Sequence, residues 1–173
     1  MAVEEDLPAL QDIERDAGAL FRDLGMHSVA DDAPPDLAAL RVFRRDGRAW
    51  VFVDGDDRPV AYVLVEIVDD RAHVEQVSVH PSHARRGIGR QLVDYADSWA
   101  AEHGLSELTL TTYVDVPWNG PYYRRLGFRF MQEDEIGEQL RAIREREAAS
   151  GLDTWPRAAM IREGMAIRPV PFE

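Results

Sequence analysis

The chain has no cysteine and no lysine, and both absences narrow the chemistry that it can perform. Without cysteine it has no disulfide, no thiol nucleophile and no cysteine zinc site. All of its basic residues are arginine, which we attribute to genome composition rather than to function. No apolar run approaches the roughly 20 residues that a membrane-spanning helix needs. The N-terminal residues MAVEEDLPAL are acidic and lack the apolar core of a secretory signal, so we expect no membrane association and a cytoplasmic location.

Positive charge is also scarce. The chain carries 20 basic and 32 acidic residues, for a net charge of −12, which argues against a nucleic-acid-binding surface. The acidic excess could steer a cationic substrate, although solubility is the simpler explanation. A length of 173 residues with 45% hydrophobic content suits one domain with a real core. Because no repeat or linker interrupts the sequence, we predict a single domain over residues 1–173.

Hydrophobic periodicity predicts helices first and strands afterwards. Apolar residues at helical spacing predict a helix over about residues 5–24, capped by Gly25. A loop over 26–35 and a shorter helix over 35–45 follow. The period then changes to two, which predicts an antiparallel meander of strands at 49–54 and 60–68 and a third strand that carries Glu75.

The second half of the chain mixes both kinds of element. A central helix from Ile88 to about residue 103 leads to a strand at 107–113, which is therefore expected to be parallel to the strand before it. A short helix at 121–126 and a strand at 128–132 come next. The tail, residues 134–173, is predicted to hold a C-terminal helix over 136–149 and a last strand over 157–162.

The stretch from Val74 to Trp99 combines features that hold an anion. A strand stops at His80-Pro81, because proline cannot donate to a ladder and restricts the residue before it. The turn Arg85 to Arg90 then opens directly into an amphipathic helix. Its glycines allow close backbone approach, and the helix start offers unpaired N–H groups and a positive dipole end. We infer that the ligand is a phosphate-bearing cofactor.

A second block makes this signal specific. Alone, Arg85 to Arg90 is neither the three-glycine dinucleotide fingerprint nor a P-loop. Together with Tyr123 to Phe128, whose sequence is Tyr-x-x-x-Gly-Phe, and with Val79-His80-Pro81, it resembles the GCN5-related N-acetyltransferase family. The likeness covers about residues 47–131. Ala84 stands where the family usually has Arg or Gln, and the family's first strand is missing or cut to Ala2-Val3.

The resemblance implies an α/β fold of the α+β kind. Its mixed, mostly antiparallel central sheet would splay between two parallel strands and carry helices on both faces. Acetyl-CoA would be the cosubstrate, and no metal is implied. The pantetheine arm would pair with the strand before the turn, and the pyrophosphate would sit on the turn itself. The implied cofactor-binding residues are Val77, Ser78, Val79, Arg85, Arg86, Gly87, Ile88, Gly89, Arg90 and Asn119.

The resemblance also indicates the groups that move protons. A backbone N–H near Val79 would polarise the thioester carbonyl, and an amine would attack directly. Glu75, on the strand face of Val77 and Val79, is the candidate base. His73 on that face and water remain alternatives, and an exposed structural carboxylate is the competing role for Glu75. Tyr123 is the candidate general acid toward the CoA thiolate, with Tyr122 as the alternative.

Other residue groups give weaker signals. His80 and His83 have no carboxylate or cysteine partner at ligand spacing, so no metal site is predicted. Tyr113, Trp118 and Trp155 could line an acceptor pocket, but aromatic packing explains each equally well. An acidic loop could bind a cationic amine, although a solvated loop is the simpler interpretation; its residues are Asp31, Asp32 and Asp36.

These observations predict an acetyl-CoA-dependent N-acetyltransferase acting on a primary amine of a small molecule through a ternary complex. A protein or peptide acceptor and a non-catalytic acyl-CoA-binding module are the alternatives. The family often forms dimers, and the tail could supply the interface of a homodimer.

Overall fold

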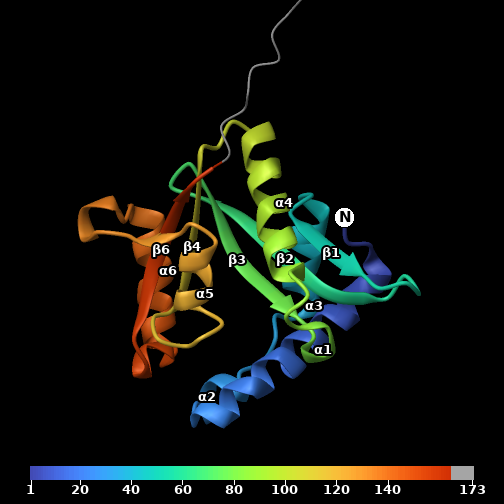
Figure 1. The fold of residues 1–173 in the computed structure, drawn as a ribbon. Helices are drawn as coiled ribbons and strands as arrows, with labels where there is room; N and C mark the ends of the chain where they lie inside the picture. Colours follow the sequence, from blue (N-terminus) through green and yellow to red (C-terminus); the bar gives the residue numbers. More distant parts are fainter. Residues whose placement is uncertain (165–173) are drawn as a thin grey trace, which may run out of the picture. The chain divides into compact units, whose positions relative to one another are not determined.

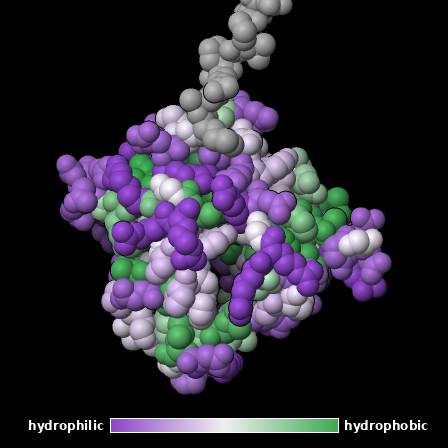
Figure 2. Space-filling model, viewed as in Figure 1, coloured by the Kyte–Doolittle hydropathy of each residue, from purple (hydrophilic) through white to green (hydrophobic). Residues whose placement is uncertain are grey.

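A computed structural model describes residues 1–164 of the chain, so the last nine residues of the predicted domain, 165–173, lie outside the described part. The described residues form two compact units. Unit 1 comprises Met1–Val65 and Val74–Asp94, and unit 2 comprises Glu66–His73 and the chain from Tyr95 onward. Figure 1 shows the elements, and Figure 2 shows that hydrophilic residues cover much of the visible surface between separate hydrophobic patches.

Six strands hydrogen-bond in the order β1-β2-β3-β4-β6-β5. Their bounds are β1 Ala49–Val53, β2 Pro59–Val68, β3 Arg71–Val79, β4 Glu107–Tyr113, β5 Arg129–Phe130 and β6 Arg157–Glu163. β3 and β4 pair in parallel at Ala72–Leu108 and His73–Thr109, whereas β1–β2, β4–β6 and β5–β6 are antiparallel. The predicted mixed, mostly antiparallel α/β fold is therefore confirmed. The predicted splay between the parallel strands stays a prediction.

The core of unit 1 forms where α1 and α3 pack on the first strands (Figure 1). α1, Leu7–Gly18, buries Leu7, Leu10 and Ile13, which recur every three residues and so share one helix face. α3, Leu37–Arg45, begins at Asp36, whose carboxylate accepts a hydrogen bond from the Ala39 N–H at 2.8 Å. These helices close over Tyr62 and Leu64 of β2.

The predicted first helix is correct in place but not continuous. Residues Glu4–Asp6 and Ala19–Leu24 are 3-10 turns on either side of α1. Gly18 ends α1, because glycine is a poor helix former and the chain tightens beyond it. Gly25 has φ 73°, as its predicted capping role requires. The predicted loop after it contains a single helical turn, α2, His27–Ala30.

Unit 2 contains the later helices and strands. α4, Ile88–Glu102, passes into it at Tyr95; α5 is Gly120–Arg125 and α6 is Glu138–Ala149. Leu140 and Ile143 of α6 pack against Val68 and Ala159. The strand predicted over 128–132 is shorter than expected, with only Arg129–Phe130 in regular pairing, although the Met131 N–H still donates to the Ala159 carbonyl at 3.0 Å.

The start of α6 is held by Asp69, a residue that lies far earlier in the sequence. The Asp69 carboxylate accepts hydrogen bonds from the Gln139 N–H at 3.0 Å and the Leu140 N–H at 2.9 Å. In return, the Gln139 side chain accepts from the Asp69 N–H at 2.8 Å. This exchange satisfies N–H groups that the first turn of a helix leaves unpaired, so the β2–β3 turn acts as the cap of α6.

Candidate functional site

The turn between β3 and α4 has the backbone of an anion site. β3 ends at Val79, and a 3-10 turn at Pro81–His83 follows. Arg85 has φ 59° and Gly87 has φ 76°, two left-handed positions with one residue between them. Such alternation can point successive N–H groups to one side, and the 15-residue helix α4 begins immediately afterwards at Ile88. The N–H groups and dipole of that helix start favour an anion.

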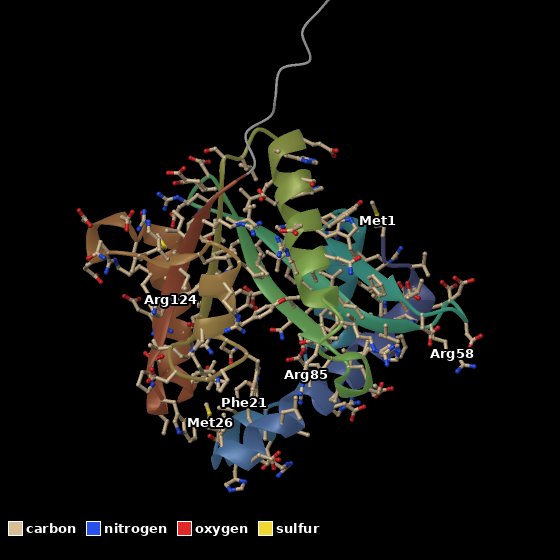
Figure 3. The ribbon with its side chains drawn as sticks, in the orientation of Figure 1. Met1, Phe21, Met26, Arg58, Arg85 and Arg124 are labelled. Atoms are coloured by element: carbon tan, nitrogen blue, oxygen red, sulfur yellow. The ribbon has the colours of Figure 1, made fainter. Side chains whose placement is uncertain are left out.

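The side chains of this turn also suit an anion site. Arg85 and Arg86 are exposed, while Ile88 is buried and anchors the start of the helix. Figure 3 shows Arg85 on the turn. The Arg86 guanidinium donates to the Ser82 carbonyl at 3.2 Å, and Arg90 lies 3.5 Å from Asp94 one helical turn on. The positive charges therefore lie on the surface beside the N–H groups.

A histidine attaches the start of this turn to α1. The His80 imidazole lies 3.1 Å from the Asp16 carboxylate through Nε2, and its Nδ1 lies 2.6 Å from the Ser82 hydroxyl. Nδ1 also accepts from the Ser82 N–H at 3.2 Å, so His80 caps the 3-10 turn. Among residues 1–164 no group of three His, Cys, Asp or Glu side chains could hold a metal ion.

β3 presents different side chains on its two faces. Glu75 is exposed, which fits both of its candidate roles, a base and a structural carboxylate, and Val77 and Val79 are half-buried. On the opposite face, Gln76 and Ser78 contact Glu14 of α1. Unit 1 therefore brings together Glu75, the strand Val77–Val79 and the turn.

His73 lies at the end of the unit 2 part of β3 and is only 1% exposed. Its Nδ1 lies 2.9 Å from the Thr109 hydroxyl of the paired strand β4. Burial lowers the pKa of His73 to about 4, although the Glu147 and Asp69 carboxylates act in the opposite direction. A group with this pKa is a weak base near pH 7, which favours a structural role for His73 over the alternative base.

The second predicted block surrounds α5. Asn119 precedes the helix, and its Oδ1 is buried without a hydrogen-bond partner. Buried polar atoms are normally paired, so this oxygen suits a ligand donor such as an amide of a pantetheine arm. A side chain on Gly120 would overlap the Val114 carbonyl oxygen, so only glycine permits this close turn. Asn119 and Tyr123 thus stand on one rigid segment of unit 2.

Tyr123 is held by rings and by an arginine outside the predicted block. It is 8% exposed, and its ring meets those of Tyr122 and Phe128 edge-on at 5.4 and 5.7 Å between centroids. The Arg162 guanidinium covers the Phe128 ring at 5.0 Å and donates to the Leu126 carbonyl at 3.0 Å. Buried Asp97 accepts from Arg162 at 2.8 Å. This arrangement fixes the block that contains Tyr123.

The weaker candidates have local roles. Asp31 pairs with Arg22, Asp32 accepts from the Ala33 N–H at 3.0 Å, and Asp36 caps α3. Each carboxylate therefore has a partner of its own, as the simpler interpretation expected. Tyr113 is buried with the Arg157 guanidinium 4.5 Å from its ring centroid, whereas Trp118 is 38% exposed.

The sequence analysis did not single out Glu14, Tyr62, Asp97 or Arg162. For Glu14 a signal existed, because it stands seven residues after Leu7 and four after Leu10, within the stripe of α1 that is otherwise apolar. A charge at such a position indicates a buried polar contact. The pairing of Arg162 with Asp97 has no comparable signal, because the two residues are 65 positions apart.

Comparison with known proteins assigns a class to this mixed sheet with a glycine turn between a strand and a long helix. The model of the acetyltransferase (GNAT) family matches residues 9–128. The chain belongs to this family, which confirms the resemblance.

The individual relatives match this chain over only part of its length. Streptothricin acetyltransferase of Streptomyces lavendulae is 39% identical over 88 residues, which are 49% of this chain and 46% of that protein. The chain thus spans about half the length of this curated relative. The crystal structure of nourseothricin acetyltransferase is similar with a TM-score of 0.52 and 25% identity, over 68% of this chain and 65% of that one.

One structure supports the fold over nearly the whole chain. PaiA N-acetyltransferase from Thermoplasma acidophilum, solved in complex with coenzyme A, has a TM-score of 0.67 and 13% identity. The similarity covers 94% of this chain and 95% of that one. At this identity the likeness concerns the fold alone.

Proposed function

We propose that the protein transfers the acetyl group of acetyl-CoA to a primary amine of a small molecule. Family membership over residues 9–128 is the observation that carries this proposal. The small-molecule acceptor is supported by the 39% identical relative, which is a streptothricin acetyltransferase. A protein or peptide acceptor and a non-catalytic acyl-CoA-binding module remain the alternatives. The cytoplasmic location and the homodimer stay predictions, and the described helices include none long and apolar enough to cross a membrane.

The turn and strand of unit 1 would bind acetyl-CoA. The backbone N–H groups of Arg85 to Arg90 would donate hydrogen bonds to the pyrophosphate, and the exposed guanidiniums would neutralise its charge. The backbone of Val77 to Val79 would pair with the pantetheine arm. Ala84 offers no side-chain donor, but contacts through N–H groups do not need one, and Arg85 lies next to it. The unpaired Asn119 Oδ1 would accept from an amide of the arm.

The reaction then needs three groups from the chain. A backbone N–H near Val79 would donate to the thioester oxygen as negative charge develops there. Glu75 would take the proton of the acceptor ammonium, directly or through a water, so that the neutral amine attacks. The new C–N bond forms as the C–S bond breaks, and Tyr123 would give its proton to the departing thiolate. The amine loses its second proton to solvent, and no covalent enzyme intermediate forms.

Thiol release in the presence of acetyl-CoA and a panel of amines tests this function. The panel should contain streptothricin, simple alkylamines and short peptides. Turnover that depends on a small amine supports the proposal. Turnover with peptides only would favour the protein acceptor. Calorimetric binding of acetyl-CoA with no turnover would favour the binding module, and a lack of binding would exclude all three functions.

A further inference from the structure

One buried hydroxyl group in unit 2 has no hydrogen-bond partner. Thr112, near the C-terminal end of β4, is 3% exposed, and its Oγ1 has no partner among residues 1–164. The other two threonines of this strand differ, because the Thr109 hydroxyl lies 2.9 Å from His73 Nδ1 and the Thr111 hydroxyl donates to a carboxylate of α6. A buried polar atom is normally paired with the chain, a ligand or an ordered water. Thr112 Oγ1 therefore marks a place for a polar group that the described chain does not supply.

The Thr112 side chain lies on the same face of β4 as Tyr123, the candidate general acid. Side chains alternate along a strand, so Thr112 shares its face with Leu108. Leu108 is paired with Arg162 of β6, and paired residues of neighbouring strands point to the same face. The Arg162 guanidinium covers the Phe128 ring, which in turn meets the Tyr123 ring edge-on. The unpaired hydroxyl thus faces the side of unit 2 on which the chemistry is proposed.

A second unpaired atom lies at the same end of β4. Asn119 Oδ1 is buried and also lacks a partner within the described part of the chain. The next residue, Gly120, packs so closely on the strand end that a Cβ there would lie 3.0 Å from the Tyr113 carbonyl oxygen. An amide oxygen only accepts, whereas a hydroxyl can donate. Asn119 and Thr112 therefore suit a ligand that carries both N–H and C=O groups.

We propose that Thr112 binds the pantetheine arm of acetyl-CoA, with its hydroxyl donating to a carbonyl oxygen of the arm. This inference rests on the proposed function, in which Asn119 Oδ1 accepts from an amide N–H of the arm and Tyr123 protonates the sulfur at its end. The amide groups of the arm supply both the acceptor for Thr112 and the donor for Asn119. Thr112 holds the arm in place and moves no proton.

Thr112→Val tests the proposal, because valine keeps the branched shape and removes the hydroxyl. Calorimetry should give a Kd for CoA about 3- to 10-fold higher than in the wild type, the loss expected for one neutral hydrogen bond. The Kd for 3′-phospho-ADP, the nucleotide part of CoA without the arm, should stay the same. Thr112→Ser keeps the hydroxyl and should retain the wild-type affinity for CoA.

A stability measurement distinguishes a ligand contact from a structural one. Without ligand, Thr112→Val should unfold at the same denaturant concentration as the wild type or at a higher one, because it removes a buried hydroxyl that has no partner. Thr109→Val is the matched control, since the Thr109 hydroxyl is buried in the same strand but pairs with His73. This variant should unfold at a lower denaturant concentration and bind CoA with the wild-type Kd.

The same measurements separate the inference from the proposed function. An unchanged Kd for CoA in Thr112→Val would overturn the inference and leave the proposed function standing. An equal loss of affinity for 3′-phospho-ADP, or a loss of stability as large as that of Thr109→Val, would also overturn it, since either result shows that the hydroxyl supports the fold. If Thr112→Val does not fold, Thr112→Ala takes its place in the binding comparisons. A wild type that binds no CoA would contradict the proposed function, and the inference with it.

Discussion

His73 is a neutral imidazole packed in the interior beside Thr109. Its pKa is about 4 in the folded chain, against an ordinary value of 6.5. The unfolded chain therefore binds a proton that the folded chain does not between these two pH values. As the pH falls from 6.5 toward 4, this difference removes stability, by about 3 kcal/mol at most.

Denaturant unfolding at a series of pH values tests this effect. The stability of His73→Gln should decline less than that of the wild type between pH 6.5 and pH 4, since glutamine does not titrate in this range. His27→Gln alters an exposed histidine and serves as the control. Equal declines in the wild type and His73→Gln would refute the account of His73.

Tyr123 and Tyr122 are adjacent, and they allow a matched test of the general acid. Tyr123→Phe should lower kcat by on the order of 10²-fold, because the thiolate then leaves without a proton donor. The affinity for acetyl-CoA should stay the same. Tyr122→Phe should change kcat little. Steady-state kinetics and calorimetry measure both quantities, and an unchanged kcat in Tyr123→Phe would remove this tyrosine from the mechanism.

For single residues, the sequence predicted those that lie next to a recognisable motif. It did not predict the residues elsewhere in the chain that hold the motif in place. Tyr123 could be predicted because it stands four residues before Gly127 in the sequence. Arg162 and Asp97, which hold the Phe128 ring against it, come from β6 and α4. Only the folded chain brings such residues together, so spacing along the sequence could not indicate them.

At the scale of elements, the turn before α5 depends on Gly120. A Cβ there would overlap the Val114 carbonyl oxygen and lie 3.0 Å from that of Tyr113. Gly120→Ala should therefore destabilise the protein by about 1–3 kcal/mol, measured by denaturant unfolding. Gly55→Ala is the control, because nothing lies within 4 Å of a Cβ at that position. Similar stability in both variants would contradict the close packing of this turn.

The start of α6 offers a second test at this scale. Asp69→Ala removes both hydrogen bonds to the Gln139 and Leu140 N–H groups. The loss of a helix cap costs about 0.5–2 kcal/mol, which thermal unfolding can detect. Asp70→Ala, at the next position of the same turn, should cost less. The opposite order of the two variants would show that Asp69 does not cap the helix.

The bounds of the long elements followed from periodicity, and those of the short ones did not. α4 and β4 match the predicted ranges because their apolar pattern extends over several turns or alternations. α2 is one helical turn and β5 has two paired residues. Elements of this length depend on contacts such as that between Met131 and Ala159 rather than on a pattern of their own.

At the scale of the whole molecule, the family and the mixed sheet could be predicted because two motifs and the order of elements agree. The substrate could not, since it depends on which side chains face the acceptor. Glu14 illustrates how contacts between distant residues escape the sequence, because it accepts hydrogen bonds from Gln76 and Ser78 more than 60 positions away. The net charge of −12 is consistent with a cationic acceptor.

Mass spectrometry of the acceptor tests the central claim most directly. The purified protein is incubated with streptothricin, or in separate reactions with alkylamines, and with acetyl-CoA that carries an isotopically labelled acetyl group. The account predicts one labelled acetyl group on the amine, formed at the rate of thiol release and strongly reduced in Tyr123→Phe. Unmodified streptothricin and alkylamines, under conditions in which the protein binds acetyl-CoA, would contradict the claim.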